Sequence, residues 1–162
     1  MILLSIGTNI GNREENIANA ITALGTIGKV LSVSDIYTSE PWGFESENGF
    51  FNIALTMEST LSPLDLLRTT QQIERDLGRT AKTTTAYADR VIDIDIIAYN
   101  DAIIDSPTLT IPHKLMHLRN FVLYPLADIA PDWTHPQLHL TAQELKTNSP
   151  DTSIPYKYKK NK

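Results

Sequence analysis

The sequence of 162 residues contains no cysteine. This absence excludes disulfide bonds, thiolate metal sites and cysteine nucleophiles. No segment approaches the ~20 consecutive apolar residues that a membrane-spanning helix needs. Residues 1–7 lack a basic segment, and their apolar run is too short for a signal peptide. We therefore expect a cytoplasmic protein with no membrane partner, and the chain length favours a single domain.

Basic residues are scarce outside the C-terminal end of the chain. Residues 1–145 contain 9 of the 14 Lys and Arg residues but 18 of the 19 Asp and Glu residues, a net charge of −9. Nucleic-acid binding depends largely on neutralising phosphates, so we expect no nucleic-acid partner. Residues 148–162 instead carry Pro150, Pro155 and four lysines. This composition predicts a loosely ordered basic tail after a domain of residues 1–147.

The stretch 89–97, Asp-Arg-Val-Ile-Asp-Ile-Asp-Ile-Ile, has the alternation of a β-strand. Asp93 and Asp95 would share one face of this strand, and the isoleucines the other. Two carboxylates one pleat apart repel each other, and a divalent cation would compensate for this. Oxygen ligands with no Cys or His beside them favour magnesium. The alternative is that the two aspartates line the solvated face of an edge strand.

The order of the predicted elements indicates the fold. Strands are predicted at 2–6, 30–37 and 50–58, with a fourth strand carrying Asp93 and Asp95. Helices are predicted after Asn12 and after Ser62, each with a capping residue. The order βαββαβ is that of a ferredoxin-like α+β sandwich, an antiparallel sheet with helices on one face, here with C-terminal additions. We expect the first and last core strands to be central, with both aspartates facing away from the helices.

Basic side chains are close in sequence to the acidic strand. A polar connection, 79–90, precedes the strand, and its lack of periodicity predicts a mobile loop. Carboxylates that hold a metal, together with cations that hold anions, are what a nucleoside-triphosphate site requires. Any one of these cations alone would be explained by a surface salt bridge. The basic residues concerned are Arg79, Lys82, Arg90, His113, Lys114 and Arg119.

An ordered set of short motifs between residues 3 and 133 resembles the 6-hydroxymethyl-7,8-dihydropterin pyrophosphokinase family. Each motif is weak alone, and their order makes the resemblance specific. The motifs are Ser-Ile-Gly-Thr-Asn-Ile-Gly-Asn at 5–12, Glu-Pro-Trp-Gly at 40–43, Phe-Asn at 51–52, Ile-Glu-Arg-Asp-Leu-Gly-Arg at 73–79, Asp-Arg-Val-Ile-Asp-Ile-Asp-Ile at 89–96, Ile-Pro-His at 111–113 and Arg-Asn-Phe-Val-Leu-Tyr-Pro-Leu at 119–126.

The resemblance implies an ATP-dependent diphosphokinase of folate biosynthesis, a monomer that acts on small molecules. It would move the pyrophosphoryl group of ATP to the hydroxymethyl oxygen of the pterin and release AMP. The implied metal ligands are Asp93 and Asp95, which would hold two Mg²⁺ ions. The implied catalytic residues are Arg79, Lys82, Arg90 and Asp95. The implied ATP-binding residues are Gln71, Glu74, Arg90, Ile96, Thr110, His113, Lys114 and Arg119. The implied pterin-binding residues are Ser39, Glu40, Trp42, Phe50, Asn52 and Phe121.

A second function class stays open from the residues alone. A ferredoxin-like sheet also serves as a non-catalytic binding or regulatory module for RNA or a small metabolite, because fold does not fix function. RNA-binding sheets of this shape display aromatic side chains and a basic face. The predicted strand here displays Asp93 and Asp95 instead, which favours the enzyme.

Overall fold

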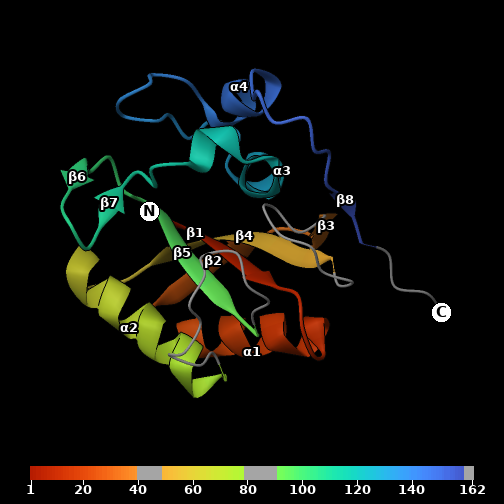
Figure 1. Cartoon of the computed structure of the whole chain (residues 1–162). Coiled ribbons are helices and arrows are strands. Elements are labelled where there is room, and N and C mark those ends of the chain that lie inside the picture. The colour runs from red at the N-terminus through yellow and green to blue at the C-terminus, as the bar shows by residue number, and fades with distance from the viewer. Residues whose placement is uncertain (40–48, 79–90, 159–162) are drawn as a thin grey trace.

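A computed structural model describes residues 1–39, 49–78 and 91–158 of the chain. Figure 1 shows a sheet with helices on both faces. The elements in chain order are β1 (Ile2–Thr8), α1 (Arg13–Leu24), β2 (Lys29–Val33), β3 (Tyr37–Ser39), β4 (Phe50–Glu58), α2 (Pro63–Asp76), β5 (Asp93–Tyr99), β6 (Ile104–Asp105), β7 (Thr110–Ile111), the 3₁₀ turn η1 (Met116–Leu118), α3 (Asn120–Ile129), α4 (Ala142–Thr147) and β8 (Tyr156–Lys157).

The main sheet has the strand order β5-β1-β4-β3-β8, with β2 also paired to β4, and all its pairs are antiparallel. Helices α1 and α2 cover one face, and α3 and α4 lie over the other (Figure 1). Strands β6 and β7 form a separate two-stranded ribbon. The predicted α+β ferredoxin-like sandwich is confirmed, since the two helices of the core, α1 and α2, lie on one face of an antiparallel sheet (Figure 1). The C-terminal additions, α3 and α4, cover the second face (Figure 1).

The prediction that the first and last core strands are both central is wrong for the last strand. Strand β1 is central, but β5 ends the order of the described strands, and β4 is the other central strand. Strand β5 pairs with β1 through one of its edges, and α2 packs against β5. The other edge of the acidic strand is not paired with any of the described strands.

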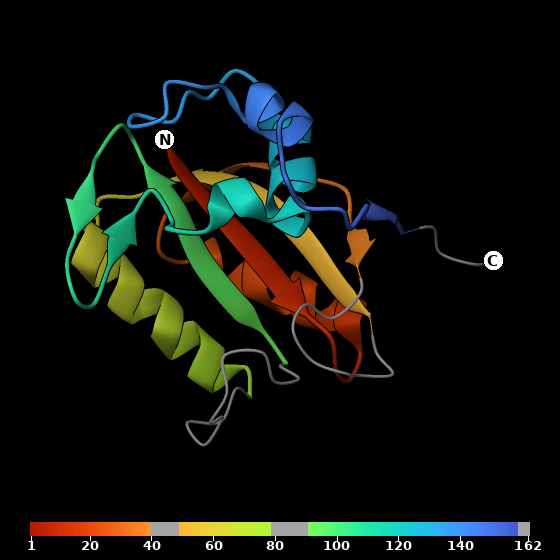
Figure 2. The same ribbon diagram turned by 45° about the horizontal axis from the view of Figure 1, so that its top comes forward.

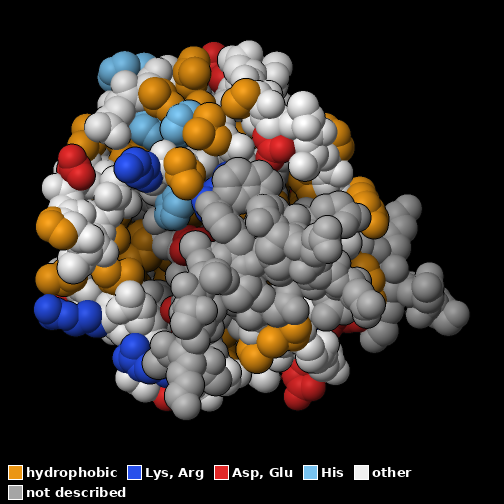
Figure 3. All heavy atoms as spheres, viewed as in Figure 1, with side chains coloured by type: hydrophobic (Ala, Val, Ile, Leu, Met, Phe, Trp, Pro, Cys, Tyr) orange, Lys and Arg blue, Asp and Glu red, His pale blue; other side chains and the backbone are white. Residues whose placement is uncertain are grey.

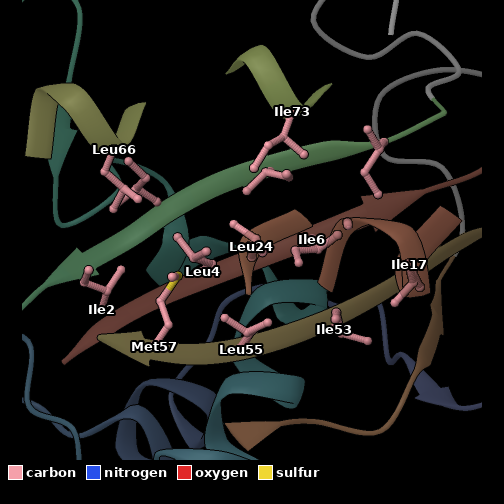
Figure 4. Packing of buried hydrophobic residues seen from close by; sticks show 14 of the residues in the cluster. Ile2, Leu4, Ile6, Ile17, Leu24, Ile53, Leu55, Met57, Leu66 and Ile73 are labelled. Carbon is pink, nitrogen blue, oxygen red and sulfur yellow. The ribbon is translucent and has the colours of Figure 1, made fainter. Parts of the chain in front are cut away.

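The larger hydrophobic core lies between the sheet and helices α1 and α2. The predicted inner face of β4 is confirmed, since Phe51, Ile53, Leu55 and Met57 are all buried in this cluster. Figure 4 shows Ile53, Leu55 and Met57 beside Leu4 and Ile6 of the neighbouring strand. A second cluster packs the opposite face of the sheet against α3 and α4, with Leu3, Ala54 and Ile97 contributed by the strands. The sheet is thus buried on both faces over much of its length.

The predicted helix starts are confirmed by their caps. The side chain of Asn12 accepts a hydrogen bond from the Glu15 amide at 3.1 Å, and that of Ser62 accepts one from the Asp65 amide at 3.2 Å. A reciprocal capping box starts α4 at Thr141. Such caps satisfy amides that the first helical turn leaves without partners.

The predicted strand 30–37 is divided into β2 and β3. At Ser34, which lies between them, the side-chain hydroxyl accepts the Ala54 amide at 2.9 Å. The Ser34 amide still donates to the Ala54 carbonyl at 2.9 Å. A side chain thus replaces a backbone group in the ladder, which interrupts the regular strand. Periodicity alone does not reveal such a substitution.

The described part of the C-terminal segment differs from the loosely ordered tail that its composition predicts. Strand β8 pairs with β3, Pro155 is buried, and the Tyr158 amide donates to the Ile36 carbonyl at 2.8 Å. The free edge of β3 supplies these partners, and composition does not show that it exists. Residues 159–162 lie outside the described part. Among the described helices, none is long and apolar enough to cross a membrane.

Candidate functional site

The two aspartates of β5 point away from the main core. Asp93 and Asp95 are half-buried, and they alternate with Ile92, Ile94 and Ile96, which are buried. Ile94 and Ile96 belong to the core beneath α1 and α2. The carboxylates therefore occupy the face that carries α3, as the alternation of the sequence predicts.

Asp93 lies in one row of the sheet with Asn52. Gly7 of β1 pairs with Asp93 on one side and with Asn52 of β4 on the other. A Cβ atom on Gly7 would lie 2.9 Å from Asn52 Oδ1 and 3.7 Å from Phe50 Cδ1. Real Cβ atoms essentially never come within 3.0 Å of another atom. The absence of a side chain at Gly7 therefore lets the Asn52 amide lie over β1, on the face that carries Asp93.

Glu74 supports the acidic strand from the other side. This residue of α2 is buried, and its Oε2 accepts the Ile94 amide at 2.7 Å. Ile94 lies between the two aspartates. A buried carboxylate that accepts a backbone N–H forms a strong, charge-assisted hydrogen bond. Glu74 thus holds the edge of β5 at the point where the aspartates project.

His113 lies beside the same strand. Its backbone amide donates to the Ile97 carbonyl of β5 at 2.9 Å, and its Nδ1 accepts the Leu115 amide at 3.3 Å. Burial lowers the pKa of His113 below its ordinary value, the Arg119 charge lowers it further, and the Asp93 charge opposes both effects. The His113 imidazole, the Asp93 carboxylate and the Arg119 guanidinium therefore lie within electrostatic reach of one another.

The start of α3 brings Arg119 and Phe121 together. Arg119 precedes the helix, and its guanidinium carbon lies 5.6 Å from the centre of the Phe121 ring. Asn120, between them, is almost fully buried. Helix α3 packs against β4, which brings this pair over the face that carries Asn52. Figure 3 shows acidic, histidine and basic side chains close together on one face of the molecule.

The predicted residues do not all come together. Those on the face that carries α3, or beside β5, are Asn52, Asp93, Asp95, His113, Arg119 and Phe121, with Glu74 at the edge of β5 and Phe50 at the start of β4. Ile96 faces the opposite core, and Thr110 lies on β7, which packs against β5. Gln71 and Lys114 are exposed. Ser39 ends β3. Those outside the described residues are Glu40, Trp42, Arg79, Lys82 and Arg90, as is the connection 79–90 that we expect to be mobile.

The carboxylates of Asp93 and Asp95 suit a hard cation whose other ligands are waters and substrate phosphates. Within residues 1–39, 49–78 and 91–158, no group of three His, Cys, Asp or Glu side chains is arranged to hold a metal. Two carboxylates are what Mg²⁺ usually takes from a protein, since it keeps waters and substrate phosphates as its other ligands. Asp93 and Asp95 fit this description.

Two contributors were missed by reasoning from sequence. Gly7 carries no assigned role in the sequence analysis, although a glycine within a strand often marks a close approach of another group. Asn120 was not assigned a role, and no local pattern distinguishes it from other asparagines at helix starts. Its partners are 31 and 33 residues away.

Comparison with known proteins identifies a family that this chain matches. The model of the family described as 7,8-dihydro-6-hydroxymethylpterin-pyrophosphokinase matches residues 3–131. A protein of Porphyromonas gingivalis, 2-amino-4-hydroxy-6-hydroxymethyldihydropteridine pyrophosphokinase, is 44% identical over 85% of this chain and 95% of its own length. A protein of the same name from Aquifex aeolicus is 34% identical over 90% of this chain and 89% of its own.

Longer proteins also contain a similar region. The folic acid synthesis protein FOL1 of Dictyostelium discoideum is 42% identical over 93% of this chain, which spans only 23% of that protein. A solved structure of Plasmodium falciparum HPPK-DHPS with pteroate has a TM-score of 0.73 at 17% identity, covering 90% of this chain and 41% of the other. The fold is thus shared with that structure. From the family match and its relatives, the chain belongs to the 7,8-dihydro-6-hydroxymethylpterin-pyrophosphokinase family.

Proposed function

We propose that this protein transfers the pyrophosphoryl group of ATP to the hydroxymethyl oxygen of 6-hydroxymethyl-7,8-dihydropterin, giving AMP, as a step of folate biosynthesis. The family to which the chain belongs supports this reaction. The observation that carries it is the row across the sheet in which Asp93 and Asn52 both pair with Gly7. A metal-binding carboxylate and a pterin-binding amide are then neighbours on one face.

The proposed metal ligands are Asp93 and Asp95, which would hold two Mg²⁺ ions. When bound, magnesium neutralises phosphate charge and orients the phosphoryl groups. As metal ligands, the two aspartates would fix the position of the metal-bound phosphates relative to β5. Glu74 holds the backbone between the two aspartates through the Ile94 amide. Positioning accounts for most of the catalysis in phosphoryl transfer.

The proposed phosphate-binding residues are His113 and Arg119, with Arg79, Lys82 and Arg90 assigned from the sequence. Arg119 offers a planar guanidinium, whose donors match the geometry of a phosphate. His113, with its lowered pKa, would act near neutral pH as a hydrogen-bonding group rather than as a cation. The remaining nucleotide contacts are proposed at Gln71, Glu74, Ile96, Thr110 and Lys114.

The proposed pterin contacts lie at the start of β4 and of α3. Asn52 is only 3% exposed, and an amide so placed is suited to hydrogen-bond the polar edge of a flat heterocycle. Phe121 offers a ring face for stacking. Phe50, Ser39, Glu40 and Trp42 complete this set as proposals from the sequence.

The proposed chemistry needs no dedicated general base. The hydroxymethyl oxygen attacks the β-phosphorus in line, the bond from that phosphorus to the α-phosphate oxygen breaks, and AMP leaves with the electron pair. The hydroxyl proton passes to solvent or to Asp95. A primary alcohol held near the phosphorus with water excluded reacts mainly through positioning.

The decisive assay distinguishes this reaction from ordinary kinase chemistry. The full chain is incubated with ATP, Mg²⁺ and 6-hydroxymethyl-7,8-dihydropterin, and the nucleotide products are separated. AMP formation that depends on both the pterin and Mg²⁺ is expected. ADP as the product, or AMP formed equally without pterin, would contradict the proposal. Ligand affinity indifferent to Mg²⁺ and without turnover would favour a non-catalytic binding module.

Partners and location complete the proposal. We propose a monomer that binds small molecules, does not bind nucleic acid and works in the cytoplasm. The acidic charge of residues 1–145 supports the lack of nucleic-acid binding. Light scattering coupled to gel filtration measures the mass in solution and tests the monomeric state.

A further inference from the structure

The C-terminal segment of residues 151–158, here called the C-terminal strap, contacts two parts of the proposed pterin pocket that are distant in sequence. Figure 2 shows it running from α4 past the start of α3 to β8, beside β3. The sequence suggested a loose tail here. Its contacts indicate a different role, which rests on the function proposed above.

At its first end, the strap contacts the start of α3. The Asn120 amide donates to Asp151 Oδ2 at 2.9 Å, and the Asn120 side chain donates to the carbonyls of Asp151 and Ser153 at 3.1 and 2.6 Å. Helix α3 has no side-chain cap from Arg119, the residue that precedes it. Asp151 therefore supplies both the missing acceptor and a negative charge at the positive end of the helix.

Asp151 is itself held in place by its neighbours. Its Oδ1 accepts the Ser153 amide at 2.9 Å, and its own amide donates to Ser149 Oγ at 3.2 Å. The carboxylate is thus fixed by the strap and presented to Asn120. Asn120 is 2% exposed, so this contact is shielded from water, and a hydrogen bond there is stronger than one at the surface.

At its other end, the strap contacts the start of β4. The Tyr158 ring lies with its centre 4.4 Å from that of Phe51, while the Arg13 guanidinium carbon lies 4.1 Å from the same Phe51 centre. The Tyr158 hydroxyl donates to Glu14 Oε1 at 3.0 Å. Phe51 is therefore held between a strap residue and helix α1.

Asn120 and Phe51, which the strap contacts, have equivalent positions in the sequence relative to the proposed ligand contacts. Asn120 lies between Arg119 and Phe121, and Phe51 lies between Phe50 and Asn52. In each case the held residue separates two proposed ligand contacts, and its own side chain is buried. Fixing the middle residue fixes the direction in which both neighbours project. One segment thus reaches both parts of the chain that would face the pterin.

We propose that the C-terminal strap positions the two walls of the pterin pocket, with Asp151 and Tyr158 as positioning residues that do not touch the substrate. Asp151 sets the start of α3, and so Arg119 and Phe121. Tyr158 sets the start of β4, and so Phe50 and Asn52. Small displacements of such groups have large effects on rate and affinity.

The test measures the KM for ATP and for the pterin in the AMP assay. Asp151→Ala is expected to raise both values about tenfold, because Arg119 and Phe121 move together. Tyr158→Ala is expected to raise the pterin KM about fivefold and to leave the ATP KM within about twofold, because it reaches only β4. Asp151→Asn and Tyr158→Phe, which keep an acceptor and a ring, should restore most of the affinity.

A matched control lies in the same strap. Tyr156 is 66% exposed, so Tyr156→Ala removes the same type of side chain without touching Phe51 and should leave both KM values unchanged. If Asp151→Ala and Tyr158→Ala lower the midpoint of thermal unfolding but leave both KM values at those of the wild type, the strap only stabilises the fold and the proposal is wrong. Should Asp151→Ala not fold, Tyr158→Ala decides by the same comparison.

Hydrogen exchange adds a readout that needs no turnover. In Asp151→Ala the amides of residues 120–123 should exchange faster and those of 50–52 should not, and Tyr158→Ala should show the reverse. Uniform acceleration across the chain, or none at either segment, would overturn the proposal. Wild-type protein that forms no AMP would contradict the proposed function, while exchange at these two segments would still test the strap.

Discussion

Asp93 and Asn52 pair with the same residue, Gly7, from its two sides. Three adjacent strands thereby bring a half-buried carboxylate and a buried amide to one face, with only a hydrogen atom as the side chain between them. The sequence separates the outer two residues by 41 positions. Asp93 and Asn52 lie opposite each other across Gly7 because β5 and β4 each pair with β1 in a fixed register.

Replacing Gly7 should damage the pterin side of the site. In Gly7→Ala the new Cβ would lie 2.9 Å from Asn52 Oδ1, so the amide must move, and we expect the pterin KM to rise about tenfold. The double variant with Asn52→Ala relieves the contact. Its free energy of unfolding should recover relative to Gly7→Ala, while pterin affinity stays low. A pterin KM equal to that of the wild type in Gly7→Ala would show that the amide is not a ligand.

Asp95→Ala should nearly abolish AMP formation, by about a hundredfold or more, because a proposed ligand of the magnesium ions that would neutralise the phosphates is lost. The fold should survive, since the side chain is half-buried and lies outside the main core. Product analysis and thermal unfolding measure the two effects. Asp105→Ala, at an exposed aspartate of β6, is the control. A fully active Asp95→Ala protein would exclude the metal assignment.

Glu74→Ala should destabilise the protein, because it leaves the Ile94 amide without the 2.7 Å acceptor that Glu74 provides. Loss of one partner of a buried hydrogen bond costs about 1–3 kcal/mol. Glu74→Gln keeps an acceptor and should cost less. Urea unfolding gives both values, and Asp76→Ala, two residues on and exposed, should change little. Equal stability of Glu74→Ala and wild type would show that this bond does not support β5.

His135 should make stability depend on pH. It is buried, its Nδ1 accepts the Gln137 and Leu138 amides at 3.1 Å, and burial, followed by the His117 and His139 charges, lowers its pKa below 6.5. As pH falls, His135 is therefore protonated in the unfolded state before it is protonated in the folded state. The contribution of His135 is therefore fully present above pH 6.5 and is lost as pH falls below that value.

The measurement compares urea midpoints of wild type and His135→Gln between about pH 8 and pH 5. The difference in unfolding free energy between them should shrink on acidification, by at most about 1.4 kcal/mol per pH unit for one proton. His139→Gln removes one of the charges that lower the pKa of His135, so this variant should show a weaker pH dependence than the wild type. A difference independent of pH would mean that His135 does not titrate as its burial implies.

Much of the fold could be read from local patterns. Alternation at Phe51, Ile53, Leu55 and Met57 predicted the inner face of β4, and the capping residues Asn12 and Ser62 predicted two helix starts. These features follow from the periods of strands and helices and from short-range hydrogen bonds. The division of the second strand at Ser34 was not predicted, since its hydroxyl bonds a residue on another strand.

The sequence could name candidate site residues but not their arrangement. It proposed Asp93, Asp95, His113 and Arg119, which stay predictions, and the resemblance of ordered motifs identified the family that the comparisons confirm. It did not reveal that β5 ends the order of the described strands or that Glu74 accepts a hydrogen bond at its outer edge. These facts depend on which strands pair, and pairing is a long-range property.

By itself, the sequence determined the strand and helix periods, the α+β class, the face on which the aspartates lie, and the family. Each of these is encoded within a few residues of the chain or in the order of short motifs. Only the tertiary structure decided that Gly7 separates Asp93 from Asn52 and that Asp151 supplies the missing acceptor for α3. These contacts join residues far apart in the chain, so they exist only once the sheet has formed and set its register.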